Sequence, residues 1–104
     1  MGPGGNSALG PVEVRISEMA KVTIRYWAAA KEAAGVAEES IEANTLSDLL
    51  NTAVASRKPD GRLATVLARS SFLVNADPVG RAARESIVLD EGSVVEVLPP
   101  FAGG

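Results

Sequence analysis

The last eight residues, 97–104, read Val-Leu-Pro-Pro-Phe-Ala-Gly-Gly, and they hold the most distinctive chemical group of the chain. The two prolines restrict the backbone to extended conformations, which predicts a stiff stem. Ala102, Gly103 and Gly104 then form a tip that is almost free of side chains, and glycine accepts the backbone angles that a narrow channel imposes. Such a tip can carry the Gly104 carboxylate to a buried reactive centre.

A terminal pair of glycines does not establish a function by itself. Chain ends are usually disordered and tolerant of change, and with glycine at ~7% of average usage the pair arises by chance in about one chain in two hundred. The weight of this feature therefore depends on what the preceding residues build.

The composition removes most kinds of catalytic site. Among 104 residues there is no cysteine and no histidine. Without cysteine, the chain has no thiol nucleophile and no thiolate zinc or iron–sulfur site. Without histidine, it lacks the side chain that most often serves as a general base. An independent hydrolase or transferase is disfavoured, and we expect no metal site and no stably bound cofactor.

Charge and hydropathy narrow the range of partners. The net charge is −3, whereas binding to nucleic acid needs clustered lysine and arginine. A membrane span needs about 20 apolar residues in a row, and the apolar runs here are short and interrupted by charge. We therefore predict a soluble, cytoplasmic protein whose partners are neither nucleic acid nor membrane.

The chain divides into three parts. Residues 1–20 are rich in glycine, proline and polar residues, which predicts a flexible leader or extension, either native or vector-derived. Residues 21–98 carry regular patterns and form the predicted domain. Residues 99–104 form the extended C-terminal tail.

The first half of the domain predicts two strands joined through a short helix. Residues 21–27 alternate between apolar and polar types, as a half-buried strand does. Residues 28–34 are good helix formers and are followed by Gly35, the usual residue just past a helix end. Residues 36–43 predict a weaker second strand that pairs with the first as a wide hairpin.

The second half begins with the main helix. Thr45 and Asp48 approximate a capping box, and residues 46–54 place leucine, alanine and valine on one stripe at helical spacing. A shorter helix follows at residues 62–70. The remaining expected elements are a strand at 72–76, a turn at Asp77-Pro78, a short strand around 87–89, a turn at 90–92 and a last strand at 93–99.

This order predicts a two-layer α+β domain in which one main helix covers one face of a mixed sheet. If the first and last strands lie side by side in parallel at the centre of the sheet, the fold is the ubiquitin-like β-grasp. The pattern alone supports the layers and leaves the strand order open.

The alternation also predicts an exposed apolar group. Trp27 shares its parity with the polar residues of the first strand, and Leu98 shares its parity with Glu96 in the last strand. Both are therefore expected on the outer surface where the tail emerges, as at a protein interface. The alternative is a bulge that turns Trp27 into the core.

Four motifs resemble the small, sulfur-carrying subunit of molybdopterin synthase (MoaD-like), within the MoaD/ThiS sulfur-carrier family. They are residues 26–35 (Tyr-Trp-Ala-Ala-Ala-Lys-Glu-Ala-Ala-Gly), 73–75 (Leu-Val-Asn), 89–92 (Leu-Asp-Glu-Gly) and 98–104 (Leu-Pro-Pro-Phe-Ala-Gly-Gly). The ending and residues 62–73 look most like the second-copy versions found in actinobacteria. The first twenty residues and Ala76-Asp77 depart from the family pattern.

The resemblance implies a carrier mechanism. An E1-like adenylyltransferase (MoeB-like) would bind the exposed surface and use ATP to adenylate the Gly104 carboxylate. A sulfur donor would then displace AMP and leave a thiocarboxylate. The tip would next enter the large synthase subunit (MoaE-like), which supplies the catalytic residues and holds the pterin precursor.

The resemblance also implies roles for side chains. It assigns docking to Trp27, Leu98 and Phe101, with Phe72 as a weaker candidate; tail threading to Pro99, Pro100, Phe101, Ala102 and Gly103; and rim charge to Arg25 and Lys31.

Three other functions remain open at this point. A carrier for another pathway, such as a ThiS-like protein, would share the tip and the activation. A ubiquitin-like modifier would join Gly104 to lysines of target proteins. A plain interaction module would use only the exposed surface.

Overall fold

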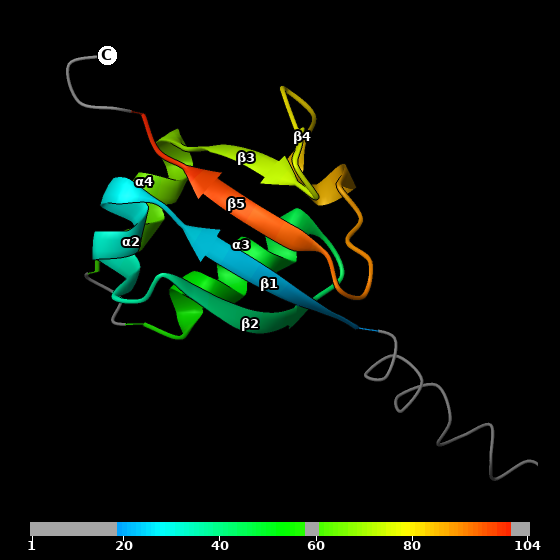
Figure 1. The fold of residues 1–104 in the computed structure, drawn as a ribbon, viewed down its shortest axis with the longest axis horizontal. Coiled ribbons are helices and arrows are strands. Elements are labelled where there is room, and N and C mark those ends of the chain that lie inside the picture. The colour runs from blue at the N-terminus through cyan, green and yellow to red at the C-terminus, as the bar shows by residue number, and fades with distance from the viewer. Residues whose placement is uncertain (1–18, 58–60, 101–104) are drawn as a thin grey trace, which may run out of the picture.

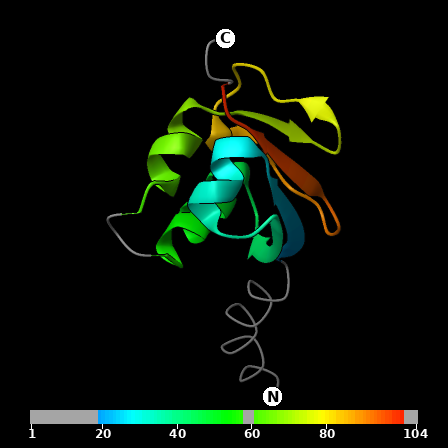
Figure 2. The same cartoon turned by 60° about the vertical axis from the view of Figure 1, so that its left-hand side comes forward.

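The computed structural model describes residues 19–57 and 61–100, and in this part of the chain the strands form one mixed sheet (Figure 1). Helices α2, α3 and α4 pack on one face of it, as the rotated view makes plain (Figure 2). The elements in chain order are β1 (Ala20–Tyr26), α2 (Ala28–Ala34), β2 (Glu38–Ala43), α3 (Leu46–Ala55), α4 (Leu63–Arg69), β3 (Ser71–Val74), β4 (Asp77–Pro78), the 3-10 helix η1 (Arg84–Ser86) and β5 (Val94–Leu98).

The strand order, which the pattern left open, is β2-β1-β5-β3-β4. β1 and β5 pair in parallel at the centre, while β1 pairs with β2, and β5 with β3, in antiparallel fashion. This is the ubiquitin-like β-grasp, and the predicted fold class is confirmed.

The core lies between the sheet and α3. Val22 and Ile24 of β1 and Val95 and Val97 of β5 are fully buried, because alternate side chains of a strand point to the same face. Helix α3 supplies the opposite wall with a stripe of four buried residues, Leu46, Leu49, Leu50 and Ala53. The predicted inner faces of the first and last strands and of the main helix are confirmed.

The start of α3 and the end of α2 are set by capping residues that were predicted from the sequence. The Thr45 hydroxyl accepts a hydrogen bond of 3.1 Å from the Asp48 backbone N–H, which caps α3 as predicted. Helix α2 stops where Gly35 adopts φ 84, a left-handed conformation that its missing Cβ makes inexpensive. β1 and β2 therefore pair as the predicted wide hairpin, and helix α2 forms the connection between them.

The predicted turn at Asp77-Pro78 is wrong by two residues. The chain reverses at Asn75 and Ala76, which have φ values of 50 and 74. Asp77 and Pro78 form the short strand β4, which pairs with the end of β3. An asparagine tolerates positive φ, whereas the alanine after it gave no signal for a turn.

The strand expected around residues 87–89 is also absent from the described part of the chain. Val88 makes a single β-bridge with Thr45, and the flanking Ile87 and Leu89 exchange backbone hydrogen bonds of 2.9 Å with Leu46 and Asn44. This segment therefore packs along the start of α3 rather than joining the sheet.

Most of the predicted leader, residues 1–18, lies outside the described residues. Ala20 already belongs to β1 and is buried, so regular structure begins one residue before the predicted boundary. Within residues 19–57 and 61–100, no helix is long and apolar enough to cross a membrane.

Candidate functional site

The parallel pairing of β1 and β5 brings two distant parts of the sequence to one edge of the sheet. Tyr26 stands beside Val97 in the register, and the Trp27 backbone N–H donates a 3.3 Å hydrogen bond to the Val97 carbonyl. This register places Trp27 next to Leu98, the last residue of β5. Figure 1 shows the ends of β1 and β5 side by side.

Trp27 is on the outer surface, with 48% of the residue exposed. Its indole Nε1–H donates a hydrogen bond of 3.1 Å to Glu96 Oε1 on the neighbouring strand. The predicted exposure is confirmed, and the alternative of a bulge that buries Trp27 is wrong.

A strained residue separates Trp27 from α2. Ala28 has φ 47, a left-handed conformation that costs a non-glycine residue roughly 1–2 kcal/mol. The chain thereby turns abruptly from the end of β1 into a helix on the inner side of the sheet, leaving Trp27 outside. This conformation could not be predicted from the residue type, because alanine is an ordinary helix former.

The strand register surrounds Trp27 and Glu96 with apolar side chains. Leu73 stands across from Glu96, while Val94 and Leu98 precede and follow it on the same face of β5. All three are half-buried. We call the group of Trp27, Leu73, Val94, Glu96 and Leu98 the outer patch. Leu73 and Val94 were not singled out from the sequence, because their adjacency depends on the register.

Charged residues form one rim of the outer patch. Arg25 Nε lies 3.1 Å from Glu38 Oε1, with about half of each side chain exposed, so the pair contributes little stability. Arg25, Lys31 and Glu38 also line, with Trp27, a shallow pocket of about 270 Å³. The rim position expected for Arg25 and Lys31 agrees with this placement.

Of the two prolines predicted to form a projecting stem, only the second is exposed. Pro100 is exposed, but Pro99 is buried. Both line a pocket of about 290 Å³ together with α2 and α4, where Val66 and Arg69 contribute. Pro99 therefore lies on the side of the sheet that the helices cover. The predicted tip, Phe101, Ala102, Gly103 and Gly104, lies outside the described residues.

Phe72 does not belong to the outer patch, and its predicted docking role is corrected here. The residue is only 5% exposed, because it pairs with Val97 and points to the same inner face. The Arg84 guanidinium lies 4.6 Å from the centre of its ring and closes the core over it.

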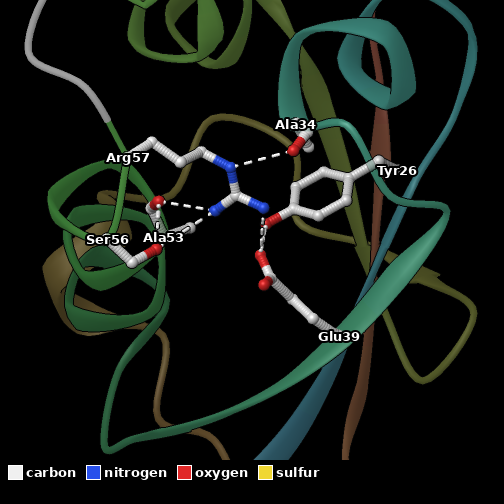
Figure 3. A network of polar contacts seen from close by, with 6 residues as sticks. All are labelled: Tyr26, Ala34, Glu39, Ala53, Ser56 and Arg57. Carbon is white, nitrogen blue, oxygen red and sulfur yellow. Dashed lines mark hydrogen bonds and ion pairs between the residues drawn. The ribbon is translucent and has the colours of Figure 1, made fainter.

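A polar network behind the patch ties four elements together (Figure 3). The Tyr26 hydroxyl donates to Glu39 Oε2 at 2.6 Å, and Arg57 Nη2 donates to the same oxygen at 2.8 Å. Arg57 also donates to the backbone carbonyls of Ala34 and Ala53, at the ends of α2 and α3. These contacts hold the end of β1 against both helices. They therefore also position the backbone of Trp27, the next residue along the chain.

Residues 24–104 match the ThiS family. The chain belongs to the ThiS family. It is thus a ubiquitin-like sulfur carrier of the MoaD/ThiS group, and the predicted resemblance is confirmed. None of the curated proteins matches the chain closely enough to add a relative.

Solved structures share this fold. Small archaeal modifier protein 1 from Methanosarcina acetivorans superposes with a TM-score of 0.70 at 22% identity, covering 83% of this chain and 98% of that one. A molybdopterin converting factor subunit 1 from Pyrococcus furiosus gives 0.59 at 25% identity, covering 79% and 99%. Subunit 1 of the Helicobacter pylori molybdopterin-converting factor, solved as a complex with subunit 2, gives 0.58 at 24% identity, covering 81% and 99%.

Proposed function

We propose that this ThiS-family chain is the small, sulfur-carrying subunit of a molybdopterin synthase. The observation that carries the proposal is the exposed Trp27 beside Leu98, at the point where the chain leaves the sheet toward Gly104. An apolar patch centred on tryptophan is typical of a binding hot spot. The family match extends to Gly104, the residue that would react.

The proposed chemistry uses the backbone terminus rather than a side chain. In an E1-like adenylyltransferase, an oxygen of the Gly104 carboxylate attacks the α-phosphate of ATP, releasing pyrophosphate and forming an acyl-adenylate. A sulfur donor then attacks the acyl carbon and AMP leaves. If the donor is a persulfide, a second thiol then attacks the donor sulfur of the acyl disulfide, which leaves a thiocarboxylate on Gly104 and the donor as a disulfide.

The second stage takes place in the large subunit. The thiocarboxylate sulfur is transferred to the pterin precursor, and hydrolysis of the acyl group restores the carboxylate. The contribution of this chain is positioning, which in well-oriented reactions lowers the barrier by about 7–11 kcal/mol. The absence of cysteine and histidine from the sequence is consistent with catalytic residues on the large subunit.

Two comparisons support a large subunit as partner. The Helicobacter pylori relative is a subunit 1 bound to a subunit 2, and the Pyrococcus furiosus relative carries the same subunit name. The motif of residues 26–35, which includes Trp27 and the turn into α2, favours the same branch of the family over thiamin-pathway carriers.

A second function is favoured by the likeness to small archaeal modifier protein 1. In that case the same activation would be followed by attack of a target lysine, and Gly104 would end in an isopeptide bond. The two functions differ in the acceptor, not in the activated terminus.

An intact-mass experiment tests the proposal. The protein is incubated with the adenylyltransferase, ATP and a sulfur donor, and then with the large subunit and the pterin precursor. Replacement of one oxygen by sulfur, reversed when precursor is converted, supports the synthase subunit. An unchanged mass with an activator that charges a known carrier contradicts it, and covalent adducts on other proteins indicate a modifier.

A further inference from the structure

Glu96 is a carboxylate with apolar side chains on three sides and Arg25 on the fourth. In the outer patch it is flanked by Val94 and Leu98 along β5 and by Leu73 across the sheet, and its carboxylate accepts a hydrogen bond from the Trp27 indole. Glu96 itself is half-buried. Any protein that covers this patch must therefore also cover a negative charge.

Within residues 19–57 and 61–100, Glu96 forms no ion pair. Arg25 stands directly across from Glu96 in the register, but its guanidinium binds Glu38 on the other side of β1, so these three side chains together carry a net charge of −1. The side-chain contact that Glu96 makes there is the hydrogen bond of 3.1 Å from Trp27 Nε1 to Oε1, and indole is a neutral donor. The second oxygen, Oε2, has no protein donor in this part of the chain and is free to accept one.

Covering the patch removes the water that solvates this carboxylate. A buried charge without a counter-charge is strongly unfavourable, whereas one that is paired and hydrogen-bonded can be retained. A purely apolar or an acidic partner surface would therefore be penalised at Glu96, and a surface with a cation at the matching position would not.

We propose that Glu96 is a specificity-determining residue that selects partners presenting an arginine at the centre of an apolar surface. This inference rests on the proposed function, because it assumes that the outer patch docks onto another protein. A guanidinium fits better than an ammonium: it is planar and weakly hydrated, it can donate to Oε2, and it can stack against the Trp27 ring.

Glu96→Gln isolates the charge. Glutamine has the same shape and keeps an acceptor oxygen for Trp27 Nε1, so the orientation of the indole and the thermal midpoint should not change. The matched control is Glu42→Gln, which removes one negative charge from an exposed position on the edge strand β2, outside the outer patch.

The affinities of wild type, Glu96→Gln and Glu42→Gln are measured by calorimetry against two proteins of the same organism, the large synthase subunit and the E1-like adenylyltransferase. For at least one of them we expect Glu96→Gln to weaken binding about tenfold or more, while Glu42→Gln has little effect. Replacing the partner's responsible arginine by methionine should weaken binding of the wild type but not of Glu96→Gln.

Equal or tighter binding of Glu96→Gln to both proteins would overturn the inference, because removal of an unpaired charge from an interface favours binding. Sulfur loading of the wild type is measured in parallel. If loading succeeds while Glu96→Gln binds normally, the carrier function stands and the role of Glu96 falls. If the wild type neither binds nor is loaded, both fall.

Discussion

The phenol of Tyr26 donates a hydrogen bond of 2.6 Å to the carboxylate of Glu39, linking the end of β1 to β2 behind the outer patch. Burial is the largest influence on the phenol and raises its pKa above the ordinary value, and the Glu39 carboxylate raises it further. The folded protein therefore holds this proton more tightly than the unfolded chain does.

Replacement of Tyr26 by phenylalanine should lower the free energy of unfolding at neutral pH by about 1–2 kcal/mol, because a hydrogen bond to a charged group is lost. The pH dependence has a definite sign. The raised pKa of Tyr26 contributes to the free energy of unfolding. This contribution is fully present below about pH 10, the pKa of tyrosine in the unfolded chain, and is lost as the pH rises beyond that value. Denaturant titrations from pH 8 to 11 should show a shallower alkaline decline in Tyr26→Phe than in wild type. Parallel declines would contradict the assignment.

Replacement of Trp27 by alanine should affect partner binding more than stability. The residue is half-exposed, so the free energy of unfolding should fall by about 1 kcal/mol or less. Loss of a hot-spot tryptophan should weaken binding to the adenylyltransferase or the large subunit by about 2 kcal/mol or more, roughly thirtyfold. Val88→Ala is the control, since Val88 is 71% exposed but lies outside the outer patch. Similar binding losses in both variants would argue against a localised patch.

Replacement of Phe72 by alanine should affect stability more than partner binding. The buried ring leaves a cavity beneath Arg84, so the free energy of unfolding should fall by about 3–5 kcal/mol. Phe72→Leu fills most of the space and should remain folded. Its affinity for either partner should equal that of the wild type. A specific loss of affinity in stable Phe72→Leu would return this residue to the interface.

Deletion of Gly104 should abolish sulfur loading without a change in the thermal midpoint. The reacting carboxylate would then belong to Gly103, one residue short of its place in the activating enzyme. Intact mass after incubation with ATP and a sulfur donor measures loading, and circular dichroism measures the midpoint. A lowered midpoint would mean that the tail has a structural role.

Much of the fold was accessible from the sequence because it depends on short-range patterns. The parity of β1 placed Trp27 outside, Thr45 marked the start of α3, and Gly35 marked the end of α2. In each case the prediction depends only on the residue type and on neighbours a few positions away in the sequence.

The remaining features depend on contacts between segments distant in the chain. Phe72 is inward because β3 pairs with β5 in one particular register, and Pro99 is buried at a pocket that residues of α2 and α4 also line. The Trp27–Glu96 hydrogen bond likewise exists only once β1 and β5 are adjacent. The early turn at Asn75 was missed because Asp77-Pro78 is the stronger local signal.

The central pairing of β1 with β5 also matters while the protein is being made. During synthesis β1 leaves the ribosome first and β5 last among the strands, so the outer patch cannot exist until the final strand has found its place. A nascent or misfolded chain in which β5 has not paired with β1 lacks Leu98 beside Trp27, even when both residues are present. An activating enzyme that contacts the two together would charge finished molecules alone, and the sheet order would then act as a quality check that spares ATP and sulfur.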